Sequence, residues 1–118
     1  MDKDTTKSRT IKTGGKVAGI IYGDCLRIEK RTPNQFSYKH QGYGVSVDTL
    51  IMAEAFGANR LQLIGYDGEE YNLSIHQFRA AGTTDDLGQG RQIFLSTKWL
   101  RWYSNRVPAS EQLQQALF

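Results

Sequence analysis

The sequence of 118 residues has little cysteine, proline and histidine, and it has no long hydrophobic run. Its single cysteine, Cys25, cannot form an internal disulfide, which argues against a disulfide-stapled secreted scaffold. No segment approaches the roughly 18 consecutive apolar residues of a membrane span, and the N-terminus lacks the apolar core of a signal peptide. We therefore expect one soluble domain in the cytoplasm, without membrane contact.

The same scarcity argues against reactive chemistry. His40 and His76 are the only histidines, and no HExxH or CxxC spacing occurs, so the residues of a zinc site are lacking. A thiol nucleophile would need Cys25 beside one of these histidines, and the carboxylates stand in expected turns and helix starts, where local structure accounts for them. We predict a protein that is not an enzyme, with no catalytic residue, metal or cofactor.

Positive charge is present and unevenly distributed. Residues 1–16 and residues 25–42 each carry a net charge of +3, and residues 87–107 carry four cations and no acid. Residues 43–86 hold seven acids against two arginines, a net charge of −5. An acidic middle between basic flanks permits binding to a polyanion without requiring it.

Local patterns predict two β-hairpins. Residues 16–22 and 25–31 flank Gly23-Asp24, which suits a two-residue turn that places Ile21 opposite Leu26. Residues 60–66 and 69–73 flank a turn with Gly68 in the left-handed region, which places Leu63 opposite Tyr71. Residues 35–40 and 92–95 alternate like further strands, and residues 83–90 read as a loop.

Helix signals follow two of these segments. A helix after residue 47, capped by Ser46 or Asp48, is expected to end at Gly57. Ser74 and Gln77 have the spacing of a capping box, which predicts a second helix over residues 75–81 that stops at Gly82. Residues 98–103 fit either an extended strand or a helix capped by Ser96 or Thr97.

These elements predict an α+β fold. We expect a twisted antiparallel sheet of about five or six strands built from hairpins, with two short helices packed on it. Residues 1–13 are expected to form a flexible basic tail and residues 14–107 the single domain. Residues 108–118, which begin with Pro108, are expected to add a C-terminal helical segment.

One stretch offers a functional lead, because basic and aromatic residues interleave in it. Aromatic rings stack on unpaired bases, while lysine and arginine hold phosphates. If the stretch is a helix, its two tryptophans and its tyrosine fall together and could equally fill the core. The candidate residues for binding nucleic acid or a partner are Lys98, Trp99, Arg101, Trp102, Tyr103 and Arg106, with Arg91, Lys39 and Tyr43 as additions.

The sequence therefore favours a small non-enzymatic binding module that engages nucleic acid or a nucleic-acid-handling protein. In length and charge the chain is similar to accessory proteins of phages and plasmids, which implies an accessory or inhibitor role. The alternative is a protein–protein interaction or homo-oligomerisation domain without nucleic-acid contact. That alternative draws on a sheet edge and on apolar residues near the C-terminus, such as Leu113 and Leu117.

Overall fold

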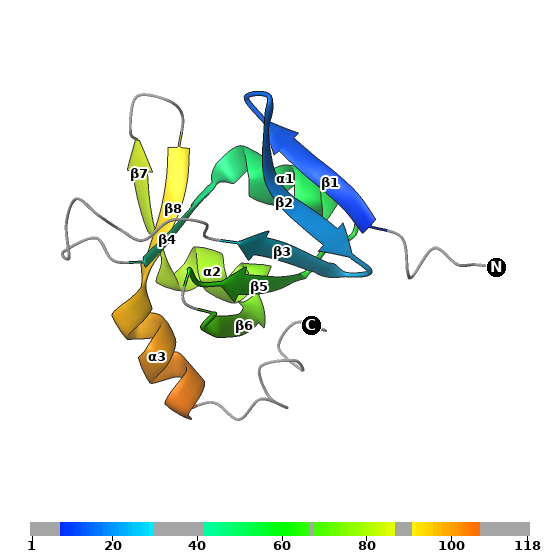
Figure 1. Cartoon of the computed structure of the whole chain (residues 1–118). Helices are drawn as coiled ribbons and strands as arrows, with labels where there is room; N and C mark the ends of the chain where they lie inside the picture. The colour runs from blue at the N-terminus through cyan, green and yellow to red at the C-terminus, as the bar shows by residue number, and fades with distance from the viewer. Residues whose placement is uncertain (1–7, 30–41, 67, 87–90, 107–118) are drawn as a thin grey trace.

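The computed structural model describes residues 8–29, 42–66, 68–86 and 91–106. It confirms the predicted α+β class, with eight strands divided between two sheets and three helices (Figure 1). The order is β1 (Ser8–Thr13), β2 (Lys16–Tyr22), β3 (Cys25–Glu29), β4 (Gly42–Ser46), α1 (Val47–Ala55), β5 (Arg60–Ile64), β6 (Glu70–Ser74), α2 (Ile75–Ala81), β7 (Thr83–Asp86), β8 (Arg91–Ser96) and α3 (Thr97–Arg106).

The five-stranded sheet has the order β1-β2-β3-β5-β6 and contains both predicted hairpins. Ile21 pairs with Leu26 and Leu63 pairs with Tyr71, as expected. Gly23 has φ +63° and Gly68 has φ +92°, the left-handed backbone that each turn needs. Local turn chemistry therefore set the register of both hairpins.

The strand arrangement differs from a single antiparallel sheet. Strands β3 and β5 run parallel, because β4 and α1 carry the chain back between them. The crossover is closed by backbone bonds, in which the amides of Asn59 and Arg60 both donate to the carbonyl of Asp24, at 2.9 and 3.1 Å. Strands β4, β8 and β7 separate into a second, antiparallel sheet.

Two segments form strands that the sequence patterns did not predict. Residues 8–13, assigned to the tail, form β1, because Ile11 is fully buried and the Gly14-Gly15 turn pairs the strand with β2. Residues 83–86, assigned to a loop, form β7 by pairing with β8. Both segments are mostly polar, so neither shows the apolar alternation that marks a strand. Residues 1–7, the predicted strand 35–40 and the C-terminal segment 108–118 lie outside the described residues.

The helices begin where hydroxyl caps were expected. The amide of Thr49 donates to Ser46 Oγ at 3.1 Å, and the amide of Gln77 donates to Ser74 Oγ at 2.9 Å. Helix α2 covers the predicted residues and stops at Gly82. Helix α1 has its C-cap at Phe56, one residue before the predicted Gly57, which follows it with φ +95°. Residues 98–103, whose pattern fits either a strand or a helix, belong to helix α3.

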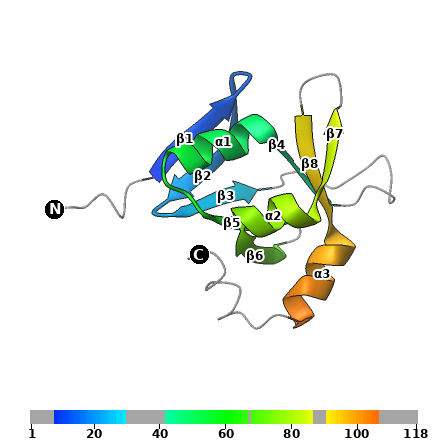
Figure 2. The same ribbon diagram turned by 180° about the vertical axis from the view of Figure 1, so that it is seen from behind.

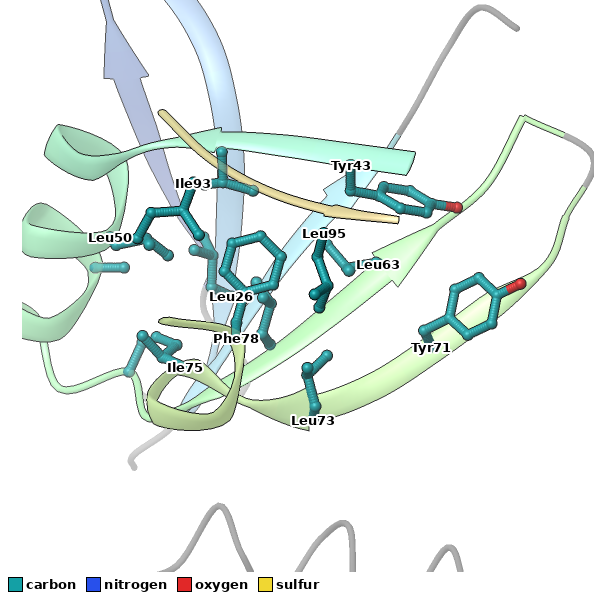
Figure 3. Packing of buried hydrophobic residues seen from close by; sticks show 14 of the residues in the cluster. Leu26, Tyr43, Leu50, Leu63, Tyr71, Leu73, Ile75, Phe78, Ile93 and Leu95 are labelled. Atoms are coloured by element: carbon teal, nitrogen blue, oxygen red, sulfur yellow. The ribbon is translucent and has the colours of Figure 1, made fainter. Parts of the chain in front are cut away.

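Helices α1 and α2 lie against one face of the five-stranded sheet, behind it in Figure 1 and in front of it in Figure 2. Strands β4 and β8 close one side of the core, and Figure 3 shows the fully buried Phe78 of α2 among aliphatic side chains from both sheets, including Leu26 and Leu95. Helix α3 continues directly from β8 and contacts β4, β6 and β8. The core thus holds the N-terminal end of α3, which follows β8 directly.

Candidate nucleic-acid interface

Helix α3 has one buried and one exposed face. Its first turn is capped by Ser96, whose Oγ accepts a hydrogen bond from the Trp99 amide at 3.1 Å. Leu100 is fully buried and Tyr103 is 5% exposed, so these two residues attach the helix to the core. Residues on the opposite side of the helix are left for solvent.

Three exposed residues line this opposite side. Lys98, Trp102 and Arg106 are four residues apart, which places them along one side of an α-helix. The Trp102 side chain is 49% exposed, a large value for an indole in a small domain. We call these three residues the α3 stripe.

The exposed indole rests on a second aromatic layer. The Trp99 ring lies 6.0 Å from the Trp102 ring and stacks on Tyr103 at 5.0 Å with an interplanar angle of 13°. The Arg106 guanidinium lies 5.0 Å from the centre of the Trp102 ring, within cation–π range. Because Trp99 is half-buried and packs against the core, its ring supports the ring of Trp102.

No acid of the described residues neutralises the positive charge of the stripe. Among the described residues, Lys98 and Arg106 have no carboxylate partner, whereas four other arginines do. Those pairs are Arg27 with Glu29, Arg60 with Asp24, Arg79 with Glu54 and Arg101 with Glu69. The stripe therefore keeps two cations available, one helical turn on each side of Trp102.

Arg101, a predicted contact residue on the same helix, is already engaged. Its guanidinium donates twice to the Glu69 carboxylate, at 2.7 and 3.1 Å, and the Tyr71 hydroxyl donates to the same carboxylate. Burial, followed by this hydrogen bond to Glu69, raises the pKa of Tyr71 to about 12. Sequence reasoning missed Glu69 and Tyr71, because no local pattern links them to a helix about 30 residues later.

The other predicted residues are not brought to the stripe. Tyr43 is 6% exposed, and its ring meets Tyr71 edge-on at 6.1 Å, so both this ring and that of Tyr103 belong to the core. Arg91 is at the far end of β8, about 17 Å from Ser96 at 3.3 Å per residue, and it is paired in register with Asp86. Lys39 lies outside the described residues.

The described residues contain no group of three or more His, Cys, Asp or Glu side chains that could hold a metal ion. Cys25 is half-buried, and burial raises the pKa of its thiol above the ordinary value, so the thiol is neutral at neutral pH. Within the described part of the chain, no helix has the length and apolar character that crossing a membrane requires.

Comparison with protein-family models, with curated proteins and with solved structures finds no match to this chain.

Proposed function

We propose that this protein is a small non-enzymatic binding module that acts in the cytoplasm and binds nucleic acid through the α3 stripe. The observation that supports this function is the placement of two unneutralised cations on either side of a half-exposed, firmly backed tryptophan. Cations supply the phosphate contacts that dominate affinity for nucleic acid, and the indole offers a face to a base once the Arg106 guanidinium over its ring moves to a phosphate.

The spacing of the stripe suits a nucleic-acid strand. Lys98 and Arg106 are eight residues apart, which is about 12 Å along the helix axis at 1.5 Å per residue. A B-form DNA duplex rises about 3.4 Å along its axis per nucleotide step, so on a duplex the two cations span three to four steps. Trp102 lies between them and contacts a base within that span.

A protein partner is the second candidate for the same surface, including a nucleic-acid-handling protein or a second copy of this chain. It is favoured by the exposed Trp102 with Arg106 over its ring, because tryptophan and arginine are the residues most enriched in interface hot spots. The two candidates differ in salt dependence. Phosphate contacts release condensed counterions and give steep salt dependence, whereas an aromatic anchor in a protein pocket does not.

The test uses fluorescence anisotropy with labelled single-stranded and duplex oligonucleotides over a series of salt concentrations. The double variant Lys98→Ala/Arg106→Ala is expected to lower the slope of log affinity against log salt by about 1.4 for single strands and about 1.8 for duplex. Trp102→Ala is expected to weaken single-strand binding by on the order of 1–3 kcal/mol through lost stacking.

Arg27→Gln is a control for loss of a cation outside the stripe, because it removes one exposed cation that is paired with Glu29 on β3. It is expected to leave the slope close to that of the wild type. Absence of any binding at low salt, or binding that ignores the α3 variants while they remain folded, would eliminate nucleic acid as the ligand of the stripe. Light scattering of the same samples then decides between a second copy and another partner.

A further inference from the structure

A second cationic surface lies far from α3 in the sequence. From Ser8 to Tyr22 the hairpin of β1 and β2 carries Arg9, Lys12 and Lys16 and no acidic residue. Among the described residues none of the three cations has a carboxylate partner, and Arg9 instead lies over the Phe56 ring at 4.2 Å. The hairpin is thus a continuous positive element without internal neutralisation.

The end of this hairpin projects from the sheet. Among the described residues, β3 pairs with Ile20, Ile21 and Tyr22 of β2, and the residues of β2 before Ile20 are paired there with β1 alone. Gly14 and Gly15 have φ +58° and +79°, which closes the hairpin with a tight two-residue turn. Figures 1 and 2 both show this turn standing beyond α1, at the opposite end of the molecule from α3.

Most side chains at this end are turned to solvent, whereas Thr13 and Ala18 are half-buried. Ile11 is the last fully buried residue of β1 before the turn. Beyond it Lys12 and Lys16 are exposed, and Val17 is 53% exposed. We call residues 12–18 the β1–β2 arm, and its length is about 10 Å, or three strand residues at 3.3 Å each.

We propose that the β1–β2 arm is a second nucleic-acid contact that enters the major groove of double-stranded DNA, with Lys12 and Lys16 on the flanking phosphates. The inference rests on the proposed function and adds the class of nucleic acid. The major groove of B-form DNA is about 12 Å wide and 8.5 Å deep and admits a two-stranded β-ribbon. An arm of about 10 Å reaches its floor, whereas the narrow major groove of double-stranded RNA excludes it.

Charge also indicates whether the arm binds DNA or a β-strand of another protein. An exposed β-edge can pair with a strand of another protein, and lysines on the edge are a common device against that pairing. The arm has two lysines within five residues and no acid, which opposes edge pairing and attracts phosphates. Duplex DNA is therefore the ligand that we propose for the arm.

The test uses the full chain with a short DNA duplex and one of its strands as probes. The double variant Lys12→Gln/Lys16→Gln is expected to lower the slope of log affinity against log salt for duplex DNA by about 1.8, and to leave single-strand binding unchanged. Lys12→Arg/Lys16→Arg keeps both charges and is expected to retain the slope. Since both lysines are exposed, the melting temperature is expected to stay at the wild-type value.

Arg27→Gln is again a control, which removes one positive charge from the same sheet outside the arm. Duplex binding that depends on α3 and ignores the arm variant overturns this inference and leaves the proposed function standing. An equal loss on duplex and single strand overturns the groove assignment. If the wild type binds no nucleic acid, both proposals fail together.

Discussion

Glu69 joins α3 to the rest of the molecule by polar contacts. Its carboxylate accepts hydrogen bonds from Arg101 on the helix and from Tyr71 on β6. Because Arg101 donates twice to one carboxylate, the pair adds a directional contact to the packing of Leu100 and Tyr103. Arg101 therefore serves as a positioning residue for the α3 stripe, even though its charge resembles that of Lys98 and Arg106.

The Tyr71 hydroxyl gives this contact a pH dependence. Its pKa is raised from the ordinary 10 to about 12, so the neutral phenol stabilises the fold fully below pH 10 and loses that effect as pH rises toward 12. We expect the free energy of unfolding of the wild type to fall more than that of Tyr71→Phe between pH 10 and pH 12. The difference should be on the order of 1 kcal/mol.

Urea denaturation of both proteins across that pH range measures the effect. The comparison with Tyr71→Phe removes the contributions of lysines and other tyrosines, which titrate in both proteins. Parallel pH profiles for the two proteins would contradict a hydrogen-bonded, buried Tyr71.

At the scale of elements, α3 depends on its cap as well as on its two buried residues. It is a helix of ten residues, too short to persist without tertiary support. Ser96→Ala removes the oxygen that accepts from the Trp99 amide, and we expect it to lower the free energy of unfolding by about 1 kcal/mol. Chemical denaturation measures this change. Ser104→Ala, at an exposed position of the same helix, should stay within about 0.5 kcal/mol of the wild type, and an equal loss in both would argue against the cap.

The helices and strands also differ in how well the sequence predicts them. Hairpin turns at Gly23 and Gly68 and the cap at Ser74 were predictable, because each depends on residues within a few positions of one another. The parallel pairing of β3 with β5 was not, because it joins segments about 35 residues apart. Strands β1 and β7 escaped detection because their stability comes from a paired neighbour, and in β1 a single buried residue, Ile11, supplies the apolar signal.

The candidate site was only partly predictable for a related reason. Interleaved rings and cations in residues 98–106 were visible in the sequence, yet their exposure depends on which side of α3 meets the core. The structure turns Leu100 and Tyr103 inward and leaves the α3 stripe outside. Neutralisation of Arg101 by Glu69 also required knowledge of the tertiary contact.

On the scale of the whole molecule, the cations that have no acidic partner in the described part of the chain occur at two opposite ends, on the α3 stripe and on the β1–β2 arm. The ion pairs of Arg27, Arg60 and Arg79 lie on the elements between them. If both surfaces bind phosphates, their contributions to the slope of log affinity against log salt add together. Seen in three dimensions, the basic flanks of the sequence thus become two distinct surfaces on one domain.

A nuclear magnetic resonance titration of the isotopically labelled full chain with a short oligonucleotide tests the central claim most directly. Binding through the α3 stripe predicts saturable shifts of the Trp102 indole N–H and of the backbone amides around Lys98 and Arg106, weakening as salt is added. Saturable shifts confined to elements other than α3, or no shifts at low salt with a folded protein, would contradict the account.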